Sequence, residues 1–149
     1  MWTTSVAIGL LAALSALSLA GCSKELGRVP LSTQATGDTS VQLAPGNVQF
    51  WTDLNLIYFG KPSIFYQIEL EQGGSTVASA VCDPLAPKPT EWLWREVRVG
   101  AYHRVSSLGR MPCNAVVPKA GATTVRVTLA YDRVLRNVAV TKADLIVKQ

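Results

Sequence analysis

The stretch IFYQIELEQGGSTVASAVC, residues 64–82, has the pattern that decides the fold. Every second residue of its first half is apolar: Ile64, Tyr66, Ile68 and Leu70. A period of two is typical of a strand with one buried face. The Gly73-Gly74 pair can adopt the positive φ values of a tight turn, and a second strand-like run follows it. Residues 64–82 are therefore predicted to form a β-hairpin.

Segments on both sides of this hairpin repeat the alternation. It is clear in VQFWTDLNLIYF (48–59), EWLWREVRVG (91–100) and TTVRVTLAYD (123–132), and residues 137–149 can supply one or two short strands. The intervening segment DPLAPKPT (83–90) is rich in proline, which cannot donate a regular ladder of backbone hydrogen bonds. This segment is therefore predicted to be a loop between strands.

The whole chain after residue 22 lacks a sustained helical period, so an all-β fold is expected. The chain has 149 residues, of which 48% are hydrophobic, enough for one domain with a single core. We predict one antiparallel β-sandwich over residues 40–149, with about 7–9 strands. Its strand order, immunoglobulin-like or jelly-roll-like, stays open because periodicity does not encode connectivity.

The N-terminal run is uncharged and apolar. Residues 1–21 contain no Lys, Arg, Asp or Glu, and the apolar part has the length of the core of an export signal rather than of a transmembrane helix. It ends in Leu19-Ala20-Gly21-Cys22, which resembles a bacterial lipobox. The alternatives are an uncleaved signal anchor or a cysteine placed there by chance.

The lipobox resemblance implies a membrane anchor. It makes residues 1–21 a signal peptide and Cys22 the first mature residue, carrying acyl chains such as palmitate. Two or more chains anchor a protein stably in a bilayer. Ser23, in the place where an Asp commonly retains lipoproteins in the inner membrane, implies the outer membrane, facing the periplasm or the cell surface. Residues 22–39 are polar and contain glycine and proline, so we expect a flexible tether.

The other two cysteines, Cys82 and Cys113, are predicted to form a disulfide. A bridge is the default expectation for a cysteine pair in an oxidising compartment. It would close a loop of 32 residues, counting from 82 to 113 inclusive, and contribute roughly 3–4 kcal/mol in the chain-entropy description. Two buried free thiols are the alternative.

Catalytic and cofactor motifs do not emerge from the sequence. His103 is the single histidine, which leaves no histidine pair for a metal, and no metal site or cofactor is predicted. Neither a G-x-S-x-G elbow nor a phosphate-binding glycine loop is present. Glu69 and Glu71 share one strand face, which favours a solvated surface over acid–base chemistry. We therefore expect a protein that is not an enzyme.

Tryptophans beside polar side chains form a candidate binding face. If the apolar alternation marks the core side, with Leu93, Val97 and Val99 inward, the opposite side is exposed. The exposed candidates on the two strands are Trp51, Asp53, Asn55, Trp92, Trp94, Glu96 and Arg98. Exposed indoles beside hydrogen-bonding groups suit a sugar or a protein hot spot. The alternative is that the tryptophans pack in the core or under a loop.

Charge is divided unevenly along the chain. Residues 23–90 hold four basic and six acidic side chains, a net of −2, whereas residues 91–149 hold ten basic and four acidic ones, a net of +6. A basic surface outside the cytoplasm meets acidic proteins, glycans or lipid phosphates rather than nucleic acid. Dispersed arginines on a solvated face are the simpler interpretation.

These observations together predict a lipid-anchored binding or accessory module of the cell envelope. The first expectation is a protein partner from an envelope assembly. A carbohydrate-binding module for envelope or extracellular glycans is the alternative, and a hydrolase is the weakest one because no nucleophile, base and orienting group can be assembled.

Overall fold

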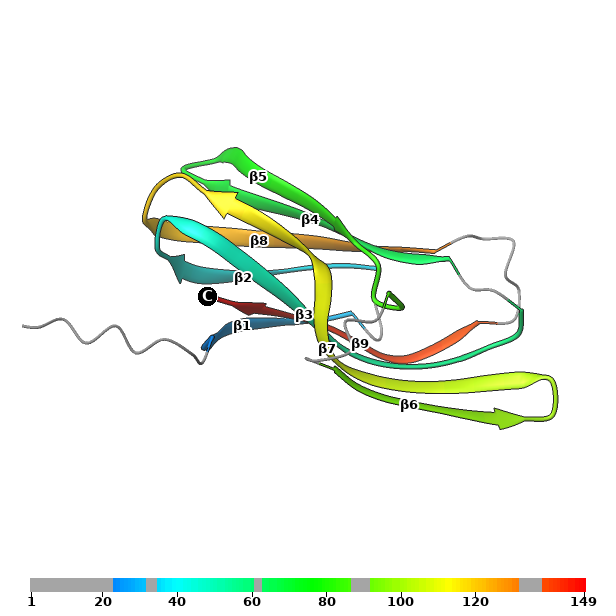
Figure 1. The fold of residues 1–149 in the computed structure, drawn as a ribbon. Helices are drawn as coiled ribbons and strands as arrows, with labels where there is room; N and C mark the ends of the chain where they lie inside the picture. Colours follow the sequence, from blue (N-terminus) through cyan, green and yellow to red (C-terminus); the bar gives the residue numbers. More distant parts are fainter. Residues whose placement is uncertain (1–22, 32–34, 61–62, 87–91, 132–137) are drawn as a thin grey trace, which may run out of the picture.

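The computed structural model describes residues 23–31, 35–60, 63–86, 92–131 and 138–149. Within these described residues, nine antiparallel strands form two sheets packed face to face (Figure 1). The five-stranded sheet has the order β1 (Glu25–Pro30), β9 (Ala139–Lys148), β3 (Gly46–Tyr58), β7 (Tyr102–Val117) and β6 (Trp92–Val99). The four-stranded sheet has the order β2 (Thr36–Leu43), β8 (Gly121–Tyr131), β4 (Ile64–Gln72) and β5 (Ser75–Cys82). The predicted all-β sandwich is confirmed.

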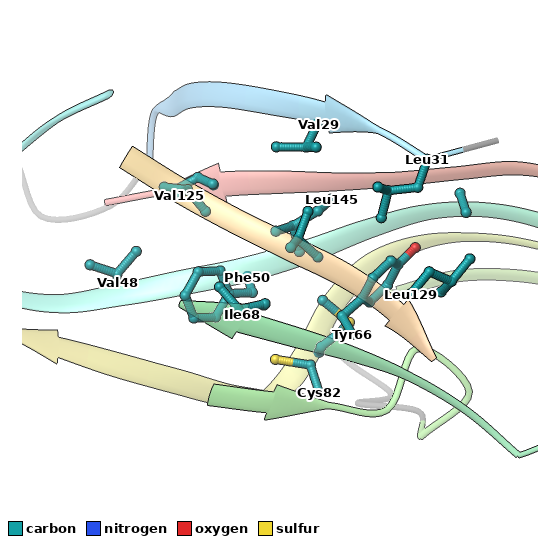
Figure 2. Packing of buried hydrophobic residues seen from close by; sticks show 14 of the residues in the cluster. Val29, Leu31, Val48, Phe50, Tyr66, Ile68, Cys82, Val125, Leu129 and Leu145 are labelled. Carbon is teal, nitrogen blue, oxygen red and sulfur yellow. The ribbon is translucent and has the colours of Figure 1, made fainter. Parts of the chain in front are cut away.

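The core lies between the two sheets, where the apolar alternation predicted it. Ile64, Tyr66, Ile68 and Leu70 of β4 are all buried in one cluster with residues of β3 from the other sheet. Figure 2 shows Tyr66 and Ile68 in this cluster together with Phe50 of β3. The predicted hairpin is confirmed as β4 and β5, and both glycines of its turn have positive φ. Alternation therefore identified the buried faces of the central strands.

One polar pair interrupts this core. Thr52 lies on the inward face of β3, where it breaks the apolar pattern, and its hydroxyl is hydrogen bonded to the Tyr66 hydroxyl at 3.0 Å. The bond satisfies both buried groups, which avoids the cost of leaving either unpaired. Burial raises the pKa of Tyr66 well above its ordinary value of 10.0, because the phenolate would be desolvated.

The N-terminal segment differs from the predicted tether. Within residues 22–39, the structure places β1 beside β9 and the first half of β2 beside β8. Val29 and Leu31 are buried, and the backbone of Leu31 donates to the carbonyl of Ala143 at 2.8 Å. These strands are mostly polar, so no apolar period reveals them. They form because distant strands offer them backbone partners.

Gly27 allows β1 and β2 to approach each other closely. A Cβ atom at this position would lie 2.6 Å from Cγ1 of Val41 and 3.3 Å from Cγ2 of Thr39, both on β2 in the opposite sheet. Both distances are shorter than ordinary van der Waals contacts, the first by far. The absence of a side chain at Gly27 is thus what lets the two sheets close at this edge.

The predicted disulfide between Cys82 and Cys113 is confirmed. It joins the end of β5 to the second half of β7, and therefore links the two sheets covalently, with the Cα atoms 5.4 Å apart. Cys82 is fully buried, and its side chain points into the core (Figure 2). The bond fixes β7 where it passes from one sheet towards the other.

The hairpin made by β6 and the first half of β7 extends away from the four-stranded sheet (Figure 1). Leu93, Val97 and Val99 were expected to face the core, and this expectation is wrong: they are 71%, 40% and 64% exposed. Every β6 residue whose burial is described is exposed. The alternation in β6 was real, but the register places Leu93, Val97 and Val99 on the outward face of the sheet, and the four-stranded sheet leaves the inward face of β6 exposed as well.

Candidate functional site

Trp51, Asp53 and Asn55 lie on the outward face of β3, half-buried among neighbouring side chains. The ammonium group of Lys148 lies 3.8 Å from the centroid of the Trp51 ring, and the indole nitrogen donates to Gln49 at 3.4 Å. The cation occupies one face of the indole, as in a cation–π contact. One face of the Trp51 ring is thus already occupied by a side chain of the same protein.

Asp53 belongs to a charged cluster that crosses three strands. Arg28 of β1 binds Asp144 of β9 at 3.0 Å and Asp53 at 3.3 Å, and Asp53 also binds Lys142. A hydrogen bond from Arg28 to Glu25, followed by those to the two aspartates, raises the pKa of this guanidinium against the opposing effect of desolvation. The cluster ties β1, β9 and β3 together on the outer face, so its carboxylates serve as partners of cations.

The remaining predicted residues lie on β6. The strand includes Trp92, whose side chain is outside the described part of the structure, together with Trp94, Glu96 and Arg98. Trp94 pairs across β7 with the inward-facing Leu54 of β3. The residues of β6 that share a face with Asp53 are the odd-numbered ones, beginning at Leu93. The register therefore separates the predicted tryptophan groups onto opposite faces of the sheet.

The inward face of the hairpin is held by a stacked pair and a hydrogen bond. His103 Nδ1 of β7 is hydrogen bonded to Glu96 Oε1 of β6, and the His103 ring stacks on Tyr58 of β3, with centroids 5.0 Å apart and planes inclined by 9°. Burial, and then the negative charge of Glu96, raise the pKa of Tyr58. This contact crosses three strands and links the hairpin to β3 close to the hairpin turn.

The outward face of the hairpin carries a row of three adjoining hollows. The first, of about 290 Å³, lies between Asp53, Asn55 and Leu93 and is also bordered by Trp94. The second and third have volumes of about 350 and 220 Å³. Neighbouring hollows share lining residues: the first two share Arg95 and Ser106, and the last two share Val99 and Arg104. We call this row the hairpin groove.

The hairpin groove is lined by both apolar and basic side chains. Val97, Val99, Tyr102 and Leu108 supply exposed apolar surface, while Arg95 and Arg104 supply positive charge. Sequence reasoning missed these residues because it assigned the odd positions of β6 to the core. The sequence nevertheless contained a signal for these residues. Both the odd and the even positions of β6 have large apolar residues and an arginine, so neither face has the composition of a buried face or of an ordinary solvent-exposed face.

Neither a cluster of metal ligands nor a membrane-spanning helix is present in the described part of the chain. Among the described residues, no three His, Cys, Asp or Glu side chains gather as metal ligands would. The same residues include no helix with the length and apolar character needed to cross a membrane.

Comparison with protein-family models, with curated proteins and with solved structures finds no significant match for the chain. The candidate site is therefore interpreted from its own geometry and chemistry.

Proposed function

We propose that the protein is a lipid-anchored binding module of the cell envelope that has no catalytic role and recognises another protein through the β6–β7 hairpin. The proposal joins two features: the lipobox-like sequence ending at Cys22, and the exposed apolar surface of the hairpin. A binding module needs a rigid scaffold and an exposed contact element, and the sandwich and its hairpin have these properties.

The distribution of exposed apolar side chains carries this proposal. Ten large apolar side chains are exposed among the described residues, and six of them lie on the hairpin: Trp94 on its inward face, and Leu93, Val97, Val99, Tyr102 and Leu108 together on its outward face. A seventh, Phe59, packs against Tyr102 with ring centroids 6.0 Å apart. Scattered apolar residues on a surface need no explanation, but a contiguous patch is typical of an interaction site.

The position of the expected anchor fits this arrangement. Only Ser23 and Lys24 separate Cys22 from β1, so lipid on Cys22 would hold the end of the sandwich where β1 begins close to the bilayer. The start of β1 lies level with Gln49 of β3, through β9, whereas the far part of the hairpin lies level with Tyr58. Nine residues of strand span about 30 Å. The hairpin would therefore face away from the membrane (Figure 1).

A carbohydrate ligand is the second candidate, and one observation favours it. Asp53, Asn55 and Trp94 all line the first hollow of the hairpin groove, Asp53 and Asn55 from the outward face and Trp94 from the edge strand, with its side chain on the inward face. An indole beside hydrogen-bonding groups can bind a pyranose ring. The greater part of the groove is nevertheless lined by valine, tyrosine and arginine, which suits a protein surface better.

Two measurements in the native cells test the proposal. Metabolic labelling with palmitate should mark the wild-type protein and not the Cys22→Ser variant; equal labelling of both would refute the anchor. For the hairpin, a photo-reactive benzoylphenylalanine replaces Val99 in one variant and Val116 in a control, since both side chains are 64% exposed but Val116 lies outside the hairpin. Crosslinks to one defined protein should form from position 99 only.

The outcome that contradicts a protein partner is also defined. Equal crosslinking from positions 99 and 116, or none from either, would refute the hairpin as the contact element. If purified protein then bound an envelope glycan and lost that binding on Trp94→Ala substitution with an unchanged melting temperature, the carbohydrate function would replace the first proposal.

A further inference from the structure

We propose that the partner binds by adding an extended strand to the free edge of β6, and that this strand carries acidic residues at two defined positions. This inference rests on the proposed function and specifies its mode of recognition. In β-strand addition, backbone hydrogen bonds supply affinity, and alternate side chains supply specificity.

The backbone of β6 is available for such pairing. β6 is the last strand of the five-stranded sheet and pairs with β7 along Trp92–Val99, without a register shift. Its other edge has no strand partner among the described residues. A regular strand of eight residues leaves roughly four N–H and C=O groups along its free edge unpaired, pointing outward.

The edge of β6 lacks proline, lysine and a bulge, and only its charged residues Arg95, Glu96 and Arg98 oppose strand addition. Proteins protect edge strands with proline, lysine, bulges or short length. The edge strand β1, at the other side of the same sheet, has a register irregularity near Gly27 and ends at Pro30. β6 has neither proline nor lysine and carries large apolar side chains on both faces. Of these two edges, β6 is the one suited to accept a strand.

Charge complementarity identifies the partner as acidic. Arg95 and Arg104 lie on the outward side of the hairpin and Arg98 on the inward side, and none of the three forms an ion pair with a described residue. The nearest acidic side chain on β6, Glu96, is already hydrogen bonded to His103. The β6 strand of a second copy would offer these arginines only Glu96, which is already hydrogen bonded to His103, whereas an acidic segment would supply carboxylates for them.

Pairing with β6 predicts which type of residue stands at each position of the partner strand. Residues directly opposite each other on paired strands share a face, so acidic side chains are expected opposite Arg98 and Arg95. Apolar side chains are expected opposite Val97, Trp94 and Leu93. Read antiparallel to β6, the partner segment is therefore acidic, apolar, variable, acidic, apolar, apolar. The two acidic residues lie three apart, on opposite faces of the added strand.

Synthetic peptides with this pattern test the proposal on the full lipidated protein in detergent micelles. The probe is an eight-residue peptide with glutamate at the two acidic positions, and its dissociation constant is measured by fluorescence anisotropy. Two further versions carry N-methyl groups on one or the other set of alternate backbone amides. Strand addition uses the N–H groups of one set only. One methylated peptide should therefore lose at least tenfold in affinity and the other should bind as the parent does.

Charge reversal tests the predicted acidic positions. The double variant Arg95→Glu/Arg98→Glu should bind the glutamate peptide at least tenfold more weakly and should bind a lysine version more tightly than the wild type does. Lys119→Glu, an exposed charge change in the turn between β7 and β8, should leave binding unchanged. Unaltered melting temperature and retained amide protection in β7 would show that the hairpin of the double variant is folded.

Defined results would overturn the proposal. Equal binding of both N-methylated peptides would refute strand addition, and equal binding of the glutamate and lysine peptides would refute the acidic partner. Concentration-dependent dimers, crosslinked between β6 strands without peptide, would identify a second copy as the occupant. If the protein crosslink from position 99 persisted in any of these cases, the proposed function would stand and only this mode of recognition would fail.

Discussion

The Cys82–Cys113 disulfide offers the sharpest test of how the fold is held together, because it links β5 of one sheet to β7 of the other. The perturbation is the double substitution Cys82→Ala/Cys113→Ala. Alanine is preferred to serine because Cys82 is fully buried, and a hydroxyl there would add the separate cost of an unsatisfied polar group.

The magnitude follows from the loop that the bond closes. The two cysteines are 31 residues apart in sequence, and the chain-entropy relation for a closed loop of that length gives about 3.7 kcal/mol at 25 °C. Loss of the buried sulfur of Cys82 adds a smaller packing cost, roughly 1 kcal/mol. The expected loss in the free energy of unfolding is therefore about 4–5 kcal/mol, which corresponds to a fall in melting temperature on the order of 15 °C.

The assay is urea unfolding followed by tryptophan fluorescence, with the wild type measured oxidised and fully reduced. The reduced wild type should be nearly as unstable as the double variant, because neither has the cross-link. It should remain slightly more stable, because it keeps the buried sulfur of Cys82. A double variant that unfolds within about 1 kcal/mol of the oxidised wild type would refute the reasoning. It would mean that the unfolded chain is already restricted without the bond, so that closing the loop removes little of its entropy.

Two further predictions concern the sheet contact and the polar pair in the core. Gly27→Ala should lower the free energy of unfolding by about 1–3 kcal/mol, because its Cβ would overlap Val41, and adding Val41→Ala should recover part of that loss; an unchanged unfolding midpoint would contradict the close approach. Burial raises the pKa of Tyr66 above its ordinary value of 10.0, so the unfolded state releases this proton first and stability should fall as pH rises above about 10. Absorbance at 295 nm should show one tyrosine ionising only with unfolding, and Tyr66→Phe should lessen the alkaline loss of stability; an identical pH dependence in the variant would contradict the assignment.

In the proposed arrangement, one end of the molecule faces the membrane and the opposite end faces the partner. An anchor at Cys22 leaves two residues before β1, so the domain would be held against the bilayer rather than carried on a long tether. Reach would then come from the length of β3, because the hairpin runs alongside β3 and turns level with its end at Tyr58. This geometry suits recognition of a partner that lies about 30 Å from the membrane surface.

The candidate site was only partly predictable. The alternation in 91–100 correctly separated odd from even residues of β6, but it could not show that both sets are exposed. Trp51 and Asp53 were correctly placed on the outward face of β3. Their contacts with Lys148 and Arg28, however, depend on strands that are distant in sequence. The hairpin groove depends on the register between β3, β7 and β6, and this register cannot be predicted from the sequence of any one strand.

The sequence by itself determined the fold class, the inward faces of the central strands and the cysteine pair that forms the disulfide. The first two are local: a period of two shows which side chains share a face, and Gly73-Gly74 shows where the chain turns. The cysteine pair is distant in sequence but followed from the cysteine count, because two cysteines remain once Cys22 is assigned to the anchor. Tertiary structure alone decided that 25–30 is a strand, that Leu93 and Val99 are exposed, and that Arg95 and Arg104 border one groove. The physical reason is that burial requires a second layer above a face, and strand pairing requires a partner edge. Both come from segments distant in the chain, so neither is encoded in the residues that they cover.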